Sequence, residues 1–407
     1  MTFEVCYITS RYVNSIAEGV NQASVGIIDC ANRAGLKTEI ISLEPVESSK
    51  VNPSVKSINT LFNDKFPRSL QRIAYNLNLQ EIGSLSFLPF LPNYDIVHIL
   101  PPLPTIFYSA MLRLIYRFKS NREGRTKVIP HLFHPFHPVM DEFMWGEGLS
   151  AQSFWRQKLW LLKHGAFDHI FCINQYLKKY AERFVDEGVV HYVPYPVDTD
   201  RFRPSEEKDG AREALGLPVD KFIVGYIGQV YSKRGVYTLL QAFDRVSKKL
   251  PEASLVMATR VLNPEKPHVQ TFLNYLNKME SKEKVIVLSG VLEKVELFYQ
   301  AVDVMVLPFA QPYYVIDPPL VVMETLASGI PLVTTPVGAI KEVTHDGLDA
   351  IHIPPDDDLT LSEEIMKLAS DSDLRLRLGK NARNAAAKYS YDTVGARLKE
   401  TYSLILE

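Results

Sequence analysis

The sequence predicts an α/β protein with two doubly wound domains, each built on a parallel sheet that helices cover. Short apolar runs alternate with amphipathic helical stretches along the chain, which is typical of parallel strands joined by crossover helices. The 407 residues are too many for one ordinary hydrophobic core. A polar break over 194–210 separates two stretches that both show this alternation. We therefore expect domains at 1–198 and 199–389.

The expected strands are short runs rich in β-branched and aromatic residues. Those of the first half are 4–9, 96–100, 127–133 and 169–173. Those of the second half are 222–227, 254–258, 285–289, 302–307 and 332–335. Helical patterns fill the intervals, and a last helix is expected over 389–406. Ligands of such sheets bind beyond the carboxyl ends of the strands, so site residues are expected in the loops that follow these runs.

Composition and charge exclude several classes of protein. A net charge of -2 argues against binding to nucleic acid. Cys6, Cys30 and Cys172 show neither pairing nor the spacing of a metal site, which fits a reducing cytoplasm. The chain starts with a strand pattern, and no apolar run approaches the roughly 20 residues of a spanning helix. We expect a cytoplasmic protein.

The segment 308–336 is the most informative part of the chain, because it places one acid, Glu324, within an otherwise apolar helix pattern. A buried carboxylate is costly unless a partner bonds it. Pro318 and Pro319 would open this helix, with Asp317 as its N-cap. The helix start would attract a phosphate, and Glu324, two turns in, could accept hydrogen bonds from ribose hydroxyls.

This layout resembles the nucleotide-sugar site of the retaining glycosyltransferases of family four, the glycogen-synthase-like group. The resemblance covers nearly the whole chain. It implies the GT-B fold, in which two Rossmann-like domains face a central cleft. It also implies that the last helix, over 390–407, joins the N-terminal acceptor domain, while 199–389 forms the nucleotide-sugar donor domain.

A glycine-containing turn with cations follows the first expected strand of the second half, an arrangement that suits a diphosphate. The family has Gly-Arg-Leu, three residues and Lys-Gly here. With the glycines aligned on Gly228, Gln229 replaces the arginine and Arg234 replaces the lysine, while Lys233 supplies a second cation. The resemblance implies that these residues bind the donor and that Arg234 stabilises the leaving group. A solvated charge pair at the turn is the alternative.

The family also places two glutamates around the helix start, with seven residues between them. Counting back from Glu324, the first acid would fall at Ile316, and Asp317 lies one place later. Asp317 either orients the transferred sugar or only caps the helix, and both interpretations stay open. Pro319 and Leu320 stand near the phosphate position, where the family has Gly-Phe-Gly, although a proline has no N–H to donate.

Further site residues follow from the resemblance. His134 matches the family's histidine near the reacting sugar, and a purely structural role is the alternative. Gly19 marks the turn that approaches the donor phosphates. Arg11 either meets an anionic group of the acceptor or is an exposed cation without that role. The family recognises the base through backbone near Gly290 and Val291.

The sequence predicts neither a metal nor a cofactor. His131, His134 and His137 have a spacing that suggests a metal site, but the prolines between them are incompatible with one helical face. Asp198 and Asp200 resemble the Asp-X-Asp metal motif of other glycosyltransferases. Because they lie in a proline-containing segment, we interpret them as turn residues.

We therefore expect a metal-independent, retaining glycosyltransferase that moves a sugar from a UDP- or GDP-linked donor to a hydroxyl acceptor. The alternatives are a non-catalytic relative that binds a nucleotide sugar as a partner subunit, and a GT-B epimerase or phosphorylase. Acceptors in this family are often lipid-linked, and the basic, apolar stretches 108–127 and 154–163 suit peripheral contact with the inner membrane face. Ordinary surface helices explain these stretches equally well.

Overall fold

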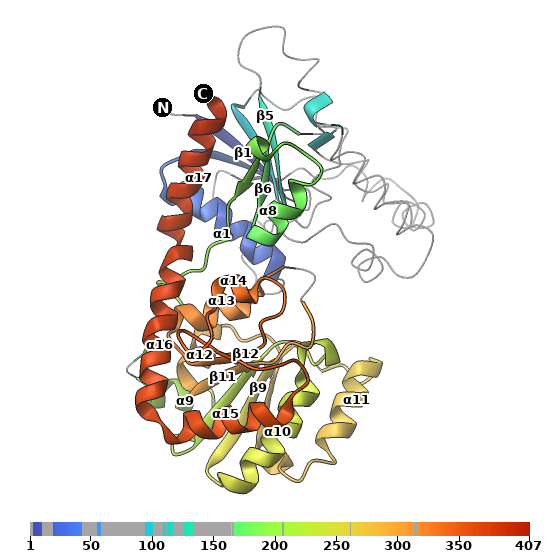
Figure 1. The fold of residues 1–407 in the computed structure, drawn as a ribbon, viewed down its shortest axis with the longest axis vertical. Helices are drawn as coiled ribbons and strands as arrows, with labels where there is room; N and C mark the ends of the chain where they lie inside the picture. The colour runs from blue at the N-terminus through green and yellow to red at the C-terminus, as the bar shows by residue number, and fades with distance from the viewer. Residues whose placement is uncertain are drawn as a thin grey trace. The chain divides into compact units, whose positions relative to one another are not determined.

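The protein is described by a computed structural model, drawn as a ribbon in Figure 1. The structure describes residues 3–9, 19–42, 55–57, 94–100, 109–110, 112–114, 116, 126–132, 164, 167–205, 207–260, 262–312 and 316–407. The chain divides into two compact units. The first consists of Met1–Pro196 together with Tyr391–Glu407, and the second of Val197–Ser390. Each unit has its own sheet.

The first unit contains a seven-stranded sheet in the order β3-β2-β1-β4-β5-β6-β7. Its strands are β1 (Glu4–Thr9), β2 (Lys37–Ser42), β3 (Val55–Ser57), β4 (Ile96–Ile99), β5 (Lys127–Leu132), β6 (Ile170–Cys172) and β7 (Val190–Tyr192). Neighbouring strands are parallel throughout. The helices α1 (Gly19–Arg33), α8 (Gln175–Ala181) and α17 (Tyr391–Leu406) belong to the same unit.

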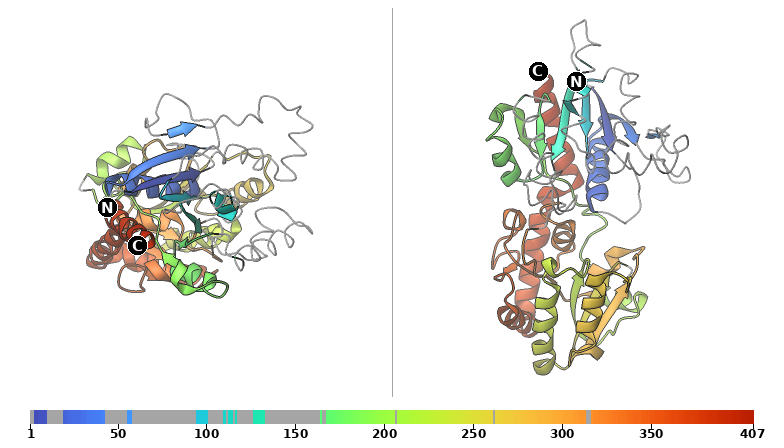
Figure 2. Two further views of the ribbon diagram at one scale, coloured as in Figure 1. Left: turned by 90° about the horizontal axis from the view of Figure 1, so that it is seen from above. Right: turned by 90° about the vertical axis from the view of Figure 1, so that its right-hand side faces the viewer.

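The C-terminal helix α17 packs along α1, as the red and blue helices of Figures 1 and 2 show. The two helices approach closely at Gly395, where a Cβ atom would stand 2.5 Å from the carbonyl oxygen of Cys30. A larger residue would therefore push the helices apart. Arg33 of α1 also lies over the ring of Tyr391, with Cζ 4.7 Å from the ring centroid.

A buried chain of hydrogen bonds fixes α17 to the sheet of the first unit. Burial lowers the pKa of His98 and of His131, the latter to about 3, so both imidazoles are neutral. His131 Nε2 donates to the carbonyl of Val193 at 2.9 Å, so its Nδ1 accepts from His98 Nε2 at 3.2 Å. His98 Nδ1 then accepts from the Tyr402 hydroxyl at 2.5 Å, and that oxygen accepts from Tyr7 at 3.0 Å. Each donor meets one acceptor, which fixes both tautomers.

The second unit contains a six-stranded parallel sheet in the order β10-β9-β8-β11-β12-β13. Its strands are β8 (Phe222–Ile227), β9 (Ala253–Thr259), β10 (Val285–Ser289), β11 (Val304–Leu307), β12 (Leu332–Thr334) and β13 (Ile351–His352). Its helices are α9 (Lys208–Ala214), α10 (Val236–Lys249), α11 (Pro267–Leu276), α12 (Val295–Ala301), α13 (Leu320–Ala327), α14 (Ile340–Val343), α15 (Asp358–Ser370) and α16 (Ser372–Ala386).

The order of these strands places a switch point between β8 and β11. The chain runs outward from β8 through β9 to β10, then returns beside β8 to form β11 and continues outward to β13. Loops on the two sides of such a point diverge at the carboxyl ends of the strands. A ligand site is expected there.

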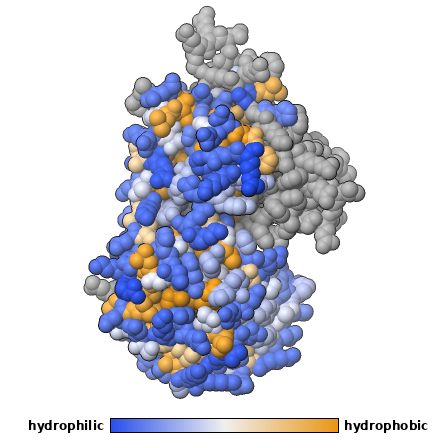
Figure 3. All heavy atoms as spheres, viewed as in Figure 1, coloured by the Kyte–Doolittle hydropathy of each residue, from blue (hydrophilic) through white to orange (hydrophobic). Residues whose placement is uncertain are grey.

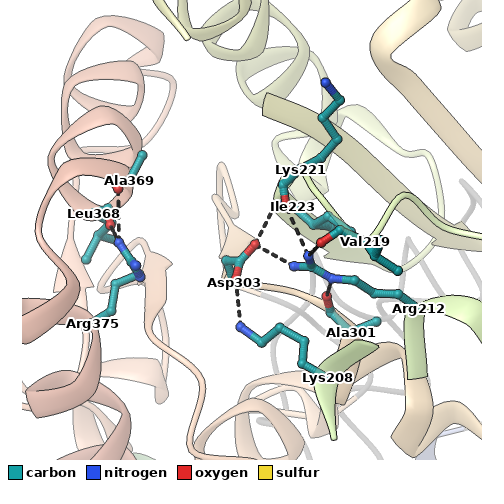
Figure 4. A network of polar contacts seen from close by, with 10 residues as sticks. All are labelled: Lys208, Arg212, Val219, Lys221, Ile223, Ala301, Asp303, Leu368, Ala369 and Arg375. Atoms are coloured by element: carbon teal, nitrogen blue, oxygen red, sulfur yellow. Dashed lines mark hydrogen bonds and ion pairs between the residues drawn. The ribbon is translucent and has the colours of Figure 1, made fainter. Parts of the chain in front are cut away.

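The opposite, amino-terminal ends of β8 and β11 are held by a buried ion pair, which Figure 4 shows. Arg212 of α9 is 4% exposed and donates to Asp303 at 2.7 Å and to the carbonyl of Ala301 at 2.9 Å. Asp303 also accepts from the N–H of Ile223 at 2.7 Å and from Lys208 at 2.6 Å. The carboxylate and the guanidinium thus satisfy each other and the nearby backbone groups, as a buried pair requires.

The predicted fold class is confirmed, and each strand expected from the sequence is present. The final helix begins at Tyr391 rather than at 389, because residues Ala387–Tyr389 form a 3-10 turn. The sequence does not predict the strands β2, β3, β7 and β13. Within the described ranges, no helix is long and apolar enough to cross a membrane. On the face drawn in Figure 3, hydrophilic residues predominate and groups of apolar residues interrupt them.

Candidate functional site

The loops that follow β8, β11 and β12 lie together at the carboxyl edge of the second sheet. β11 pairs in parallel with both β8 and β12. Thr335, after β12, donates its hydroxyl to the carbonyl of Phe309, after β11, at 2.7 Å. Gly228, after β8, donates its N–H to the carbonyl of Ala258 in β9 at 3.0 Å. The bond of Thr335 joins the loops after β11 and β12, and the bond of Gly228 continues the pairing of β8 with β9.

The turn after β8 is fixed against the loop after β11. It passes through a short 3-10 helix, Ser232–Arg234, before α10 begins. Gly235 has a φ of +70°, and a Cβ atom there would lie 1.6 Å from the carbonyl oxygen of Pro308. Only glycine fits this position. Ala310 also donates its N–H to the carbonyl of Lys233 at 3.1 Å, so the turn and the loop share one arrangement.

Arg234 folds back over the glycine that opens this turn. A Cβ atom on Gly228, whose φ is +151°, would stand 2.6 Å from Arg234 Nη1. The guanidinium carbon also lies 5.9 Å from the ring centroid of Phe309, and the side chain is half-buried. The glycine therefore leaves room for the cation beside backbone N–H groups, a combination that suits a phosphate.

The other two polar residues of the turn lie differently. Gln229, where the family has arginine, is half-buried, and its carbonyl accepts a hydrogen bond from the hydroxyl of Tyr226 at 2.8 Å. This hydrogen bond stabilises the turn, and it involves the backbone of Gln229 and not its side chain. Lys233 is exposed, so its charge is screened by water more strongly than that of Arg234.

The prediction that Asp317 caps the following helix is wrong. α13 begins only at Leu320, and its N-cap position is Pro319, which makes no side-chain capping bond. Asp317 instead accepts a hydrogen bond from the N–H of Ala339, just before α14, at 2.8 Å. Gly338 leaves the room for this, since a Cβ atom there would lie 2.4 Å from Asp317 Oδ2.

The environment of Asp317 favours its neutral form. The residue is 6% exposed, and this burial raises the pKa of its carboxyl to about 7, although the N–H of Ala339 opposes the shift. Ile316, where the family has its first acid, is buried at 3% exposure. An apolar side chain, Ile316, therefore occupies the position of the family's first acid. The carboxyl group of Asp317 is bonded to the loop after β12.

Glu324 lies one turn into α13 rather than two, because the helix starts later than expected. It is 9% exposed, and its Oε2 accepts a hydrogen bond from the hydroxyl of Tyr299 in α12 at 2.5 Å. Burial raises the pKa of Glu324, while the hydroxyl of Tyr299 and the charge of Arg201 lower it. The sequence does not reveal Tyr299 as a partner, because a tyrosine in an apolar helix pattern is typical of the core.

Gly290 and Val291 lie at the same edge, after β10. Gly290 donates its N–H to the carbonyl of Thr259 at the end of β9, at 2.9 Å. Its φ is +128°, and nothing lies within 4 Å of where a Cβ atom would be. Val291 is 66% exposed. The backbone at Gly290 therefore has open space where a side chain would be.

The remaining predicted residues belong to the first unit. Gly19 begins α1. Arg11 and His134 lie outside the described residues. His131 is one of the three histidines whose spacing suggests a metal site. Its ring nitrogens instead form hydrogen bonds with His98 and with the carbonyl of Val193.

In the described part of the chain, no group of three or more His, Cys, Asp or Glu side chains could hold a metal ion. Asp198 Oδ1 accepts from the N–H groups of Asp200 and Arg201, both at 3.1 Å, which is the bonding of a turn.

Comparison with known proteins relates this site to a family. Residues 207–385 match the model of the family described as glycosyl transferases group 1. The match covers most of the second unit, Val197–Ser390. D-inositol 3-phosphate glycosyltransferase from Corynebacterium urealyticum is 27% identical over 214 residues, which are 50% of this chain and 49% of that protein. The enzyme of the same name from Xylanimonas cellulosilytica is 27% identical over 220 residues, 53% of this chain and 51% of that one. The chain spans about half the length of the curated relatives it matches.

Solved structures resemble the chain over nearly its whole length. HepE from Anabaena, in complex with UDP and glucose, has a TM-score of 0.72 at 14% identity, covering 98% of this chain and 99% of HepE. Sucrose-phosphate synthase from Thermosynechococcus elongatus has a TM-score of 0.73 at 16% identity, covering 99% of each chain. At such identities the likeness establishes the fold, which is GT-B with two Rossmann-like domains.

Proposed function

We propose that this protein transfers a sugar from a nucleoside-diphosphate donor to a hydroxyl acceptor, with retention of configuration and without a metal ion. The observation that carries the proposal is the packing of Arg234 over Gly228, beside the loop that leads to α13 and Glu324. This arrangement offers a cation and backbone N–H groups to phosphate, and a carboxylate to a sugar hydroxyl, at one sheet edge.

In the proposed reaction, Arg234 stabilises the negative charge that develops on the departing diphosphate. Lys233, more exposed, adds a weaker attraction. A fixed cation is most effective where charge appears in the transition state, and the close packing of Gly235 against Pro308 fixes this turn. With such a cation in place, the leaving group would need no metal ion.

Glu324 would accept hydrogen bonds from the ribose, and backbone at Gly290 and Val291 would meet the base. The donor would be UDP- or GDP-linked. The structures of HepE in complex with UDP and with UDP-glucose favour uridine as the first base to test. His134 would orient the sugar, as the family resemblance implies. The acceptor would be a hydroxyl compound, in keeping with relatives named for inositol 3-phosphate.

Donor binding can be tested through the melting temperature of the purified protein with UDP, GDP, ADP and their sugars. A ligand at about 100 times its dissociation constant should stabilise the protein by roughly 2.7 kcal/mol. We expect the shift to disappear in Glu324→Ala and to persist in Glu283→Ala, an exposed control in the same unit. Absence of a shift with every nucleotide would refute the proposal.

Transfer is tested separately with the donor that binds. NMR of the glycoside formed in the presence of EDTA should show the anomeric configuration of the donor. An inverted product would overturn the retaining mechanism, and loss of activity on adding EDTA, restored by a divalent cation, would overturn metal independence.

A second candidate is a relative that binds the nucleotide sugar without turning it over. Buried Ile316 stands where the family has an acid. The carboxyl group of Asp317 accepts a hydrogen bond from the N–H of Ala339. Tight donor binding without transfer or hydrolysis, for any acceptor tried, would favour this candidate.

A further inference from the structure

We propose that Tyr299 is a positioning residue for donor binding, because it holds Glu324 in the one orientation in which the carboxylate meets the ribose. The inference rests on the proposed function. Tyr299 lies in α12, outside the motif around α13. It would not contact the donor itself and would act on donor binding through Glu324.

The contact between the two side chains is short and buried. Tyr299 is fully buried and Glu324 is 9% exposed, and their oxygens are 2.5 Å apart. Burial, and then the charge of Glu324, raise the pKa of Tyr299 well above its usual range, so its hydroxyl keeps the proton. The tyrosine is therefore the donor, and Glu324 Oε2 is the acceptor. Such a bond is stronger when the acceptor is an ionised carboxylate than when both groups are neutral.

This bond restricts the carboxylate as well as stabilising it. The last torsion of a glutamate side chain is broad and poorly defined on its own. With Oε2 occupied by Tyr299, rotation of the carboxylate would break a buried hydrogen bond. Oε1 would then be the oxygen that meets a ligand hydroxyl.

The ring of Tyr299 is itself held in place. Phe202 packs against it edge-on, with ring centroids 5.5 Å apart and an interplanar angle of 89°. The carbonyl of Phe202 accepts from Arg383 of α16 at 2.8 Å, and the same Nη1 donates to the carbonyl of Ala327, the last residue of α13, at 2.6 Å. One arginine thus bonds both the backbone of the residue that supports Tyr299 and the helix that carries Glu324.

A purely structural role would not require this chemistry. The other buried residues of α13 are apolar apart from Thr325, so a leucine or methionine at 324 would complete the same core. Replacing buried ionic or polar groups by apolar ones is often neutral or stabilising. A carboxyl group oriented by a buried hydrogen bond at one turn from the helix start is better explained by a ligand.

The test uses Tyr299→Phe in the full chain, which removes one oxygen and keeps the ring. We expect the KM for the nucleotide-sugar donor to rise about tenfold, the cost of one lost hydrogen bond to a charged group, with kcat within about twofold. With a donor whose ribose lacks its 2′ and 3′ hydroxyls, Tyr299→Phe and the unaltered protein should have the same KM. Tyr402→Phe, which removes a comparable buried hydroxyl from the first unit, should leave the donor KM unchanged.

The outcomes separate the inference from the function on which it rests. If the unaltered protein binds and uses the donor while Tyr299→Phe keeps its KM, or loses affinity equally for the dideoxy donor, the positioning role is overturned and the function stands. If the unaltered protein binds no nucleotide, both fall. Should Tyr299→Phe fail to fold, Phe202→Leu provides the same test by loosening the ring, with a smaller rise in KM expected for the ribose donor only.

Discussion

The guanidinium group of Arg234 and the α-carbon of Gly228 are so close that a Cβ atom on the glycine would stand 2.6 Å from Arg234 Nη1. The positions of the two residues therefore depend on each other: the glycine opens the turn, and its lack of a side chain leaves room for the cation. Both halves of this relationship can be tested.

Gly228→Ala should displace Arg234 and lower kcat/KM for the donor by at least about tenfold, because the new methyl group occupies the place of the guanidinium. Gly216→Ala is the matched control, since Gly216 also has a positive φ, +66°, but has open space around it. Each variant should lose about 1–2 kcal/mol of stability from backbone strain. Steady-state kinetics and urea unfolding check this, and equal kinetic losses in both would contradict it.

Arg234→Ala should lower kcat by about 10²–10³, the usual effect of removing one group that stabilises transition-state charge. Arg234→Lys should recover part of the rate, because it restores the charge but not the planar fork of donors. Lys233→Ala, which removes the exposed neighbour, should change kcat much less. Single-turnover measurements with saturating donor distinguish these cases, and a normal rate in Arg234→Ala would exclude the assigned role.

The stability of the second unit should fall as the pH rises from about 4 to 7. Burial raises the pKa of Asp317 to about 7 in the folded protein, so the carboxyl group loses its proton at a lower pH in the unfolded chain. The free energy of unfolding therefore falls as the pH rises through this range. Asp317→Asn should flatten this slope and be the more stable form at pH 8, since its amide oxygen can still accept from Ala339. Hydrogen exchange of residues 316–340 at pH 5 and pH 8 reports it. An unchanged slope in the variant would mean that Asp317 is not the titrating group.

The first unit should respond to pH in the opposite sense. Burial lowers the pKa of His131 to about 3 and also that of His98, so the unfolded chain binds protons first as the pH falls below about 6.5. Stability contributed by the pair is present at neutral pH and is lost toward pH 3. His131→Gln can donate to Val193 and accept from His98, so it should reduce this loss. Exchange of the α17 amides between pH 4 and pH 7 measures it, and equal acid sensitivity in the variant would contradict the assignment.

Much of the fold could be predicted from the sequence, because buried parallel strands are continuous apolar runs. Residues 222–227 and 285–289 match β8 and β10 in both bounds. The strands that the sequence does not reveal are short or polar. β2 reads Lys-Thr-Glu-Ile-Ile-Ser, and β13 has two residues, so pairing with a neighbour makes these strands rather than their own pattern.

The candidate site could be predicted only where a motif carries it. Glu324 and the turn from Gly228 to Arg234 stand out, because an acid in an apolar helix and glycines beside cations are rare patterns. The cap at Asp317 was wrong because two prolines delay the helix until Leu320, which leaves the carboxylate nearer to Ala339 than to the helix start. Tyr299 could not be found, since its role depends on a partner from another helix.

The close approach of α17 to α1 at Gly395 has a consequence for the order in which the chain acquires its structure. Val197 and Ser390, the two ends of the second unit, form a bridge, and the N–H of Val197 donates to the carbonyl of Tyr389 at 2.8 Å. That unit is therefore a continuous insertion, complete as soon as residue 390 has left the ribosome. The first unit begins earlier but is completed only by residues 391–407, so the face of α1 that packs on α17 stays uncovered until those residues have been synthesised.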